Sequence, residues 1–471
     1  MKRTLRLLSL ALLVVFAIAA CSAPFTVNQA REESSGPQFS RAASRSGGSA
    51  ELQEYLIVGV DTLPSGLERS VERLGGAVLS ATDEVGLAVV ALPDARGAGR
   101  VSRISGVRSV IPNATVNWLP GERYFKLADE VELDSVDPSD DALAGLLWGL
   151  DAINAPEAWA AGATGEGVTV AVLDSGIDPG HPDLVDNISP LSASLVADEP
   201  YLNDGDGHGT HVAGTIAAVD NDLGVIGAAP DVEILAVKVL GATGSGSFGD
   251  VLNGILYAHA AGADVINMSL GALLQRRGLY DENGVKVVNA NEISELVNIF
   301  TRVINYVHTN GTLVVSSAGN DALNSTGDAG IIYLPADAGR TISVSATGPL
   351  GWGLDPTTDL DVPAFYTNYG SSIDLAAPGG NVDFSLYPDP ATLWFYDLVL
   401  STYSVYDPAT ETTSRGYAWL AGTSMAAPHV AAVAALIIDA HDGEISPSQV
   451  ETILRQSADD LGKPGNDPYY G

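Results

Sequence analysis

Five short runs of apolar and β-branched residues recur through the last two thirds of this 471-residue chain, and they constrain its fold more than any other feature. Stretches of helical character separate the runs. Continuous apolar strands that alternate with helices are typical of a parallel sheet with both faces covered, because neither face meets water. We therefore predict an α/β domain around a parallel sheet. The predicted strands are Val168–Leu173, Ile234–Val239, Val265–Met268, Leu313–Val315 and Thr341–Val344.

Polar residues follow two of these strands, at the sheet edge where α/β proteins place their sites. Asp174 follows the first strand and precedes Ser-Gly. A carboxylate there can orient a catalytic base, although Asp before Ser-Gly is also common as a turn former or a metal ligand. Asn320 lies just beyond the fourth strand in Ser-Ser-Ala-Gly-Asn. Its amide can donate to a developing oxyanion, an interaction worth roughly 3 to 4 kcal/mol in a transition state; the alternative is a turn.

Two histidines lie in the segment Gly-Asp-Gly-His-Gly-Thr-His, numbered 205–211. Glycines flank His208, so both backbone and substrate can approach it. His211 lies one helical turn further on, and such a pair can bind metal. The Glu of the zinc-protease helix motif is missing, however, and no third ligand is evident. We therefore interpret His208 as the functional residue and His211 as a packed or hydrogen-bonded helix residue, and we expect no zinc.

Ser424 stands between a small-residue turn and an apolar helical run over 431–440, in Gly-Thr-Ser-Met-Ala-Ala-Pro-His-Val. This predicts a helix N-terminus, where free N–H groups and the positive dipole end favour negative charge. A serine nucleophile needs that setting, because acyl transfer develops an oxyanion beside it. Serine is also a common N-cap, so Ser424 alone leaves both roles open.

Together these segments resemble the subtilisin-like serine proteases (the subtilases, peptidase family S8), whose catalytic residues follow in the order Asp, His, Ser. The resemblance covers Trp148 to the C-terminus. It implies a three-layer, parallel-sheet, subtilisin-like catalytic domain over 146–471. By this resemblance Ser424 attacks the scissile carbonyl, and His208 acts as general base and then general acid. Asp174 orients His208, while Asn320 and the Ser424 backbone N–H stabilise the oxyanion.

The same resemblance implies a substrate-binding segment and a structural calcium ion. Ser269-Leu270-Gly271 is the segment expected to pair with an extended peptide. The first pocket would be lined by Ala318-Gly319 and a wall near Leu334-Pro335-Ala336, and its lack of charge favours apolar or uncharged side chains. Calcium prefers hard oxygen ligands, and an acidic surface loop is the alternative reading. The implied ligands are Asp140, Asp183, Val219, Asn221, Leu223 and Val225.

Two insertions relative to compact subtilases interrupt the catalytic domain. One lies between Ala272 and Asn310, and the other lies between Gly380 and Gly416. We expect both to flank the substrate cleft and to narrow its specificity.

A small unit precedes the catalytic domain. Residues 51–116 show the order βαββαβ of a ferredoxin-like α+β fold and resemble the inhibitory propeptide of subtilases. Residues 117–145 form an acidic linker without clear periodicity. The resemblance places the maturation site near Trp118-Leu119, but Pro120 on the leaving side makes that bond a poor substrate. We expect cleavage between Gly121 and Leu146 instead.

The N-terminus has the features of a secretory signal peptide over 1–20, with a basic start and an apolar run, 7–18, that is too short to span a membrane. Cys21 is the only cysteine, so no intrachain disulfide can form. Ile-Ala-Ala-Cys resembles a bacterial lipobox, which implies lipidation of Cys21; a chance cysteine at an ordinary cleavage site is the alternative. Residues 21–50 resemble a flexible tether. We expect an extracytoplasmic, lipid-anchored precursor whose autocleavage frees the enzyme.

The formal net charge of −35 disfavours binding to nucleic acid or to anionic lipid through charge. We therefore expect polypeptide substrates and the protein's own propeptide as partners, no nucleic acid, and membrane contact only through a lipid on Cys21. A non-catalytic, lipid-anchored binding protein on a protease fold would require a broken triad or oxyanion donor, and none is broken. An esterase would carry Gly-x-Ser-x-Gly, which the segment around Ser424 lacks.

Overall fold

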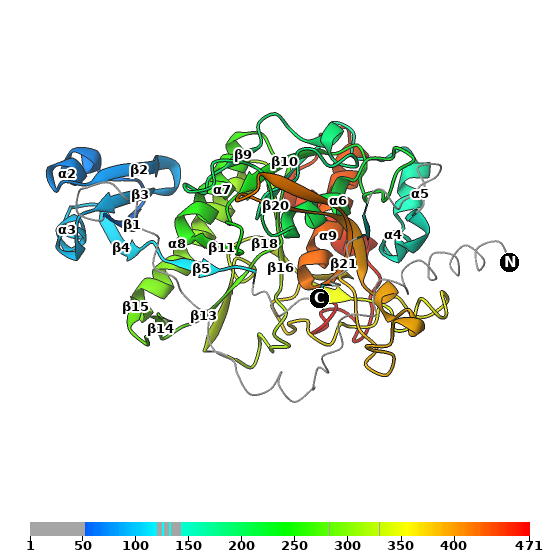
Figure 1. Cartoon of the computed structure of the whole chain (residues 1–471). Coiled ribbons are helices and arrows are strands. Elements are labelled where there is room, and N and C mark those ends of the chain that lie inside the picture. The colour runs from blue at the N-terminus through cyan, green and yellow to red at the C-terminus, as the bar shows by residue number, and fades with distance from the viewer. Residues whose placement is uncertain (1–51, 120–124, 127–130, 133–142, 282, 329) are drawn as a thin grey trace.

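The computed structural model describes residues 52–119, 125–126, 131–132, 143–281, 283–328 and 330–471. They form a small N-terminal unit beside a larger α/β domain (Figure 1). The predicted signal peptide, Cys21, the tether and Asp140 lie outside the described residues. Within the part of the chain that is described, no helix combines the length and apolarity needed to cross a bilayer.

A seven-stranded sheet forms the centre of the α/β domain. Its strands lie in the order β19-β18-β16-β12-β8-β10-β9, and every neighbouring pair is parallel. All five predicted strands are present, so the parallel sheet is confirmed. The two edge strands were not predicted, because two and four residues carry too little pattern. The bounds are β8 Thr169–Asp174, β9 Ala193–Ser194, β10 Glu233–Lys238, β12 Val265–Met268, β16 Leu313–Ser317, β18 Thr341–Thr347 and β19 Leu375–Pro378.

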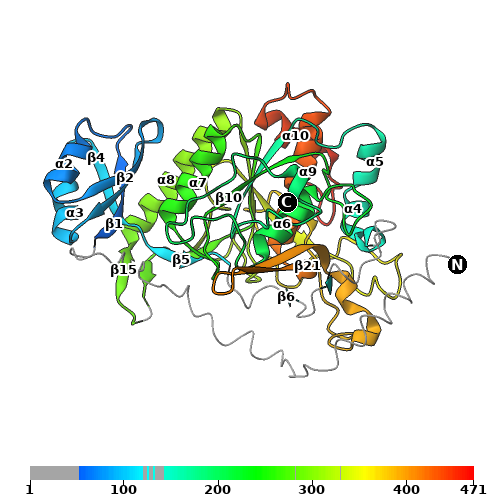
Figure 2. The ribbon, with the colours of Figure 1, turned by 45° about the horizontal axis from the view of Figure 1, so that its top comes forward.

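Alternate residues of the strands face two different helical layers. In β8, Val170 and Val172 belong to the core that includes α6 and α9, whereas Ala171 and Leu173 pack with α7 and α8. Figure 2 shows these helix pairs on opposite sides of the sheet. The predicted three-layer architecture is therefore confirmed. The helices are α4 Trp148–Ala152, α5 Ala155–Ala160, α6 His208–Ala217, α7 Phe248–Ala260, α8 Ala290–Thr309, α9 Thr423–Asp439 and α10 Pro447–Ser457, with short 3₁₀ turns at Ala144–Leu146 and Val185–Asn187.

The N-terminal unit has the predicted order βαββαβ. Its strands form an antiparallel sheet in the order β2-β3-β1-β4. One face of this sheet packs on α2 and α3, and the other shares a core with α7 and α8 of the larger domain. The bounds are β1 Gln53–Gly59, α2 Leu67–Arg73, β2 Ala77–Thr82, β3 Leu87–Leu92, α3 Ala95–Val101 and β4 Val107–Pro112, with a 3₁₀ turn at Asp83–Val85.

Polar contacts also join the N-terminal unit to α8. The Arg302 guanidinium donates to the carbonyl oxygens of Gly59 and Val85, at 3.1 Å each. Arg108 of β4 forms an ion pair of 2.8 Å with Glu295. Because that pair is partly exposed, we expect it to contribute little to stability. The shared apolar core is therefore the main attachment.

The two insertions make different contacts. The first forms β13, which extends the substrate segment and pairs with β17, and a hairpin β14–β15 whose second strand contacts β4 of the N-terminal unit. The second ends in the long hairpin β20–β21, which packs along α6. The bounds are β13 Ala272–Gln275, β14 Gly278–Tyr280, β15 Lys286–Asn289, β17 Ile331–Leu334, β20 Val399–Asp407 and β21 Thr412–Ala421, with 3₁₀ turns at Pro390–Thr392 and Trp394–Asp397.

Short strands follow β4 among the described residues: β5 lies where the N-terminal unit meets the predicted linker, and β6 and β7 lie within that linker. β5 pairs with β11 of the larger domain, and β6 and β7 pair with β21. These strands have only two or three residues each, too few for the sequence to show a period. Their bounds are β5 Thr115–Asn117, β6 Phe125–Lys126, β7 Val131–Glu132 and β11 Ser245–Ser247.

Candidate active site

Asp174 and His208 meet at the carboxyl edge of the sheet. Asp174 is the last residue of β8, and His208 is the first residue of α6. The Nδ1 of His208 lies 2.9 Å from Oδ1 of Asp174, and both side chains are 1% exposed. The same carboxylate oxygen accepts the Ser175 N–H at 2.7 Å. A buried carboxylate held in this way can orient the imidazole and stabilise its charged form.

Glycines on both sides of His208 permit this close approach. Gly207 has a φ of 94°, a left-handed conformation that glycine adopts without strain. A Cβ on Gly209 would lie 3.1 Å from the Cβ of Asp174 and would collide with the Gly176 carbonyl. The glycine pattern around His208 therefore has the role that its sequence indicates.

Asp204 organises the loop before His208, and sequence reasoning missed it. Its Oδ1 accepts the Gly207 N–H at 2.8 Å and the Ser175 hydroxyl at 2.9 Å. Its Oδ2 accepts the Thr210 N–H at 2.8 Å, which satisfies a free donor in the first turn of α6. The available signal was an Asp four residues ahead of His208, a type favoured near helix N-termini.

Ser424 is the second residue of α9, so the predicted helix N-terminus is present. Its hydroxyl donates to the Ser269 carbonyl at 3.2 Å, and the Ser269 hydroxyl donates back to the Ser424 carbonyl at 2.7 Å. Ser269 directly follows β12. These reciprocal bonds place the substrate segment predicted from sequence against the candidate nucleophile.

Thr423 fixes the orientation of the Asn320 amide. The Asn320 Oδ1 accepts from both the backbone N–H of Thr423, at 2.8 Å, and its hydroxyl, at 2.9 Å. Because the amide oxygen is held by two donors, the amide NH₂ is the end available to an oxyanion. The hydroxyl oxygen of Thr423 also accepts a hydrogen bond from the Gly319 N–H at 3.0 Å. The residue before Ser424 thus ties the candidate oxyanion donor to the nucleophile helix, a role not predicted from sequence.

The expected substrate segment is occupied by part of the chain itself. The Gly271 N–H donates to the Trp118 carbonyl at 3.1 Å, just after β5 pairs with β11 on the other side. The Trp118 side chain is 1% exposed and packs edge-on against Phe248 at a centroid distance of 5.5 Å. Residues 115–118 thus lie extended between two catalytic-domain segments, as a bound peptide would.

Comparison with known proteins identifies the family. Residues 165–471 match the subtilase family, peptidase S8. The chain belongs to the subtilase family. M-protease of Shouchella clausii is 38% identical over 324 residues, which cover 69% of this chain and 67% of that relative. Subtilisin Savinase of Lederbergia lenta is also 38% identical, over 67% of this chain and 92% of its own length. This subtilase is a serine-type endopeptidase with a subtilisin-like fold.

Solved structures extend the similarity. A protease of Pseudoalteromonas arctica is 34% identical, with a TM-score of 0.52, and the match covers 69% of this chain and 93% of that one. The epidermin leader peptide processing serine protease of Staphylococcus aureus has a TM-score of 0.65 at 21% identity. That match covers 89% of this chain and 96% of the other, so the shared fold extends beyond the catalytic domain of this subtilase.

Replacing Asn320 by Ala should lower kcat of this subtilase about 10²- to 10³-fold, the usual effect of losing one oxyanion donor. KM should change little, because the donated bond strengthens only in the transition state. Steady-state kinetics on a peptide amide measure both. Asn324→Ala, a change in the same loop, is the control and should retain kcat. An unchanged kcat in Asn320→Ala would remove Asn320 from the oxyanion site.

His211 has the structural role predicted for it. Its Nε2 lies 3.0 Å from the Ala418 carbonyl and 3.2 Å from that of Val399, so it joins α6 to the β20–β21 hairpin. Burial lowers the pKa of His211 to about 3, and the imidazole stays neutral. Among the residues that the structure describes, no three His, Cys, Asp or Glu side chains are placed to hold a metal ion.

The predicted calcium loop surrounds Asp183. The carboxylate is fully buried, and one of its oxygens accepts from the Val225 N–H at 3.1 Å and the Tyr417 hydroxyl at 2.9 Å. The Val219 N–H donates to the Asp183 carbonyl at 2.8 Å. The Asn221 side-chain oxygen accepts a backbone N–H in its own loop. Asp183 and the loop are thus brought together, whereas Asp140 lies outside the described residues.

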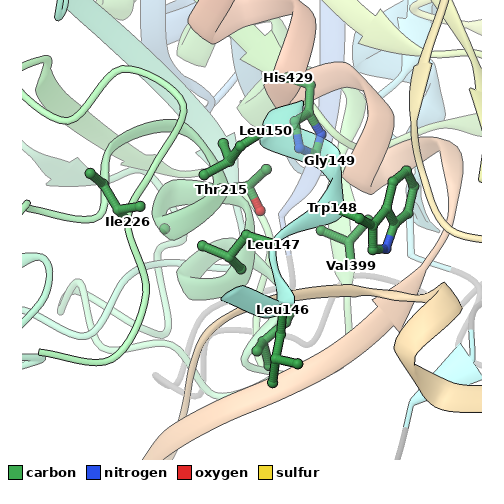
Figure 3. Close-up of a pocket in the computed structure, with 11 residues that line it drawn as sticks. Leu146, Leu147, Trp148, Gly149, Leu150, Thr215, Ile226, Val399 and His429 are labelled. Atoms are coloured by element: carbon green, nitrogen blue, oxygen red, sulfur yellow. The ribbon is translucent and has the colours of Figure 1, made fainter. Parts of the chain in front are cut away.

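A small cavity between α4 and α9 is separate from the candidate site. It measures about 20 Å³, room for one water, and most of its lining is apolar, from α4 and the residues before it together with Ile226, Val399 and Leu400 (Figure 3). His429 borders it, with Nδ1 2.8 Å from the Met425 carbonyl, and burial lowers its pKa to about 4. A Cβ on Gly149 would lie 2.8 Å from His429 Nε2. The cavity is therefore a packing space between helices.

Proposed function

We propose that this subtilase is a secreted endopeptidase, autoprocessed from a proenzyme, that hydrolyses peptide bonds with Asp174, His208, Ser424 and Asn320. The observation that supports the proposal is the buried Asp174–His208 hydrogen bond at the carboxyl edge of the sheet. Helix α6, which begins at His208, packs against the helix of Ser424, and the Asn320 amide is bound to Thr423 at the N-terminus of that helix. Such an arrangement supplies a base, a nucleophile and an oxyanion donor together.

The proposed reaction proceeds in two stages. The Ser424 oxygen attacks the scissile carbonyl while His208 takes the hydroxyl proton, and the carbonyl oxygen becomes an oxyanion bound by the Asn320 amide and the Ser424 N–H. The C–N bond then breaks, and His208 returns the proton to the leaving amine. Water attacks the resulting acyl-enzyme with His208 again as base, which releases the acid and regenerates Ser424. Asp174 stabilises the imidazolium at each stage.

A fluorophosphonate probe combined with a casein assay tests this function. Labelling of Ser424 together with casein hydrolysis is expected of an endopeptidase. Labelling without casein hydrolysis would indicate an esterase-like serine hydrolase. Neither labelling nor hydrolysis would indicate a binding protein on a protease fold, and either of these results would overturn the proposal.

We also propose that residues 51–116 act as an intramolecular inhibitor. The extended segment 115–118 lies where a substrate peptide would pair, between β11 and Gly271. The N-terminal unit shares a core with α7 and α8, which holds that segment in place. This occupancy of the expected substrate segment supports inhibition, because a substrate must displace residues 115–118 before it can pair there.

We further propose that the precursor is lipidated at its N-terminus and matures by cleavage. Cleavage between Gly121 and Leu146 would separate the catalytic domain, 146–471, from a precursor lipidated at Cys21. In cells that make Ser424→Ala, the full-length chain should carry fatty-acid label and sediment with membranes, whereas the native enzyme should release an unlabelled catalytic domain. A catalytic domain that stays joined to a labelled N-terminus in the native enzyme would contradict the release step.

Calcium is proposed as a structural ion at the loop around Asp183. The ligands would be the Asp183 carboxylate, the Asn221 side-chain oxygen, the carbonyls of Val219, Leu223 and Val225, and Asp140. The observation that supports the fit is a fully buried carboxylate enclosed by this loop. The ion would stabilise the loop and takes no part in peptide hydrolysis.

Removal of calcium should therefore lower the melting temperature. A ligand at one hundred times its Kd stabilises the folded state by about 2.7 kcal/mol, and EDTA should remove that contribution. Differential scanning fluorimetry with and without EDTA measures the shift. Asp183→Asn should abolish the response, whereas Asp220→Asn, in the same loop, should retain it. A melting temperature that EDTA leaves unchanged in the native enzyme would contradict the site.

A further inference from the structure

We propose that Tyr333 fills the first specificity pocket and restricts the residue whose carbonyl is attacked to Gly, Ala or Ser. The inference rests on the proposed function, because it takes Ser424 as the nucleophile and Asn320 as the oxyanion donor. It narrows the sequence-based expectation that this pocket accepts apolar or uncharged side chains in general.

Two glycines define the position of the pocket. The attacked carbonyl must lie between the Ser424 oxygen and the Asn320 amide, so the side chain on its acyl side enters the space beside both. Gly319 immediately precedes Asn320, and Gly271 lies two residues after Ser269, which exchanges hydrogen bonds with Ser424. The two glycines follow β16 and β12, which are neighbours in the sheet. The side chain therefore enters between Gly271 and Gly319.

The phenol end of Tyr333 occupies this space. A Cβ on Gly271 would collide with the Cε1, Cζ and hydroxyl oxygen of Tyr333. A Cβ on Gly319 would lie 2.7 Å from Cζ and 2.8 Å from Cε2 of the same ring. The Tyr333 ring thus contacts both backbone segments. A side chain at Gly271 or at Gly319 would collide with the ring, so both positions require glycine. A large substrate side chain cannot enter unless the ring leaves.

The backbone of Tyr333 is held firmly. It lies in β17, opposite Leu273 of β13, so the strand is paired directly beyond the substrate segment. Its N–H donates to the Asp337 carboxylate at 2.8 Å, and its carbonyl accepts the Asp337 N–H at 2.8 Å. Moving the ring out of the pocket therefore requires a side-chain rotation that gives up its contacts with both glycine segments. A small substrate side chain avoids that cost.

The test compares peptides that differ only at the residue before the cleaved bond, assayed with the autoprocessed enzyme. We expect kcat/KM to be at least about 50-fold higher for Ala than for Phe, since each excluded methylene group is worth about tenfold or more. Tyr333→Gly should raise the ratio of the Phe value to the Ala value by roughly 100-fold. Tyr333→Phe is the matched control, because its ring still fills the pocket, and should retain the native preference.

Several outcomes decide the question. A native enzyme that cleaves the Phe peptide as well as the Ala peptide would overturn the pocket inference and leave the protease function intact. Failure of every variant to cleave any peptide, with no fluorophosphonate label on Ser424, would instead overturn the proposed function. If Tyr333→Gly does not fold, Tyr333→Ala replaces it. N-terminal sequencing adds an independent result, since the inference requires Gly, Ala or Ser before the autoprocessed bond.

Discussion

Ser424→Ala is expected to lower kcat for peptide hydrolysis by about 10⁶-fold, because the members of a catalytic triad act as a unit. The change removes only the oxygen that bonds to the Ser269 carbonyl at 3.2 Å, at a side chain that is 6% exposed. The fold should therefore survive. The variant cannot process itself, so native enzyme should activate it in trans and then be inactivated with a fluorophosphonate, which requires the Ser424 hydroxyl, before the steady-state assay.

Two comparisons make the Ser424 prediction specific. Adding His208→Ala to Ser424→Ala should cause no further loss, since the general base has no proton to take once the hydroxyl is gone. Ser401→Ala is the control, because that buried serine bonds to the His211 carbonyl and has no proposed part in the reaction. Residual hydrolysis that falls again when His208 is replaced would show that another group serves as nucleophile.

Asp174→Asn is expected to lower kcat about 10⁴-fold while the structure is retained. One carboxylate oxygen of Asp174 accepts both the His208 Nδ1–H and the Ser175 N–H. An amide of the same shape carries no charge to stabilise the imidazolium, and its NH₂ can face Nδ1 and select the wrong tautomer. Steady-state kinetics at a pH well above the His208 pKa measure the loss without contribution from protonation.

The pH profile provides a second measurement for the same variant. Burial alone would lower the pKa of His208, but the charges of Asp174, Asp206 and Asp204 outweigh it, and the pKa is raised above its ordinary value of about 6.5. Because the base must be neutral, kcat/KM should rise with pH through that raised pKa and then level off. This rise in kcat/KM is the His208 limb of the profile, and Asp174→Asn should move it to lower pH.

Asp397→Asn is the control for the pH profile. Its carboxylate is also buried, but it accepts the N–H groups of Gly351 and Trp352 away from the proposed triad. Burial raises the pKa of Asp397 to about 6, so this variant can change stability without moving the His208 limb. A limb that stays in place in Asp174→Asn, or that moves equally in Asp397→Asn, would contradict the proposed role of Asp174.

The sequence predicted the central sheet and the candidate triad because both depend on local patterns. A strand whose two faces are both covered is mostly apolar, so the five main strands could be predicted from runs of apolar residues in the sequence. Asp174 and Asn320 come just after such strands, and parallel strands bring their carboxyl ends to one edge. That they lie near Ser424 is predicted from chain order and family resemblance. The short edge strands β9 and β19 lacked enough residues to show a pattern.

Sequence alone thus predicted the fold class and the proposed nucleophile, base and acid, since a periodic pattern reports burial along one segment and the family resemblance supplies the roles. Only the tertiary structure decided which distant groups support them. The Thr423 bonds to Asn320, the Asp204 bonds before α6, and the Tyr333 ring between Gly271 and Gly319 all join separate segments. Each depends on how two elements pack, and no local pattern records the partner that packing brings alongside.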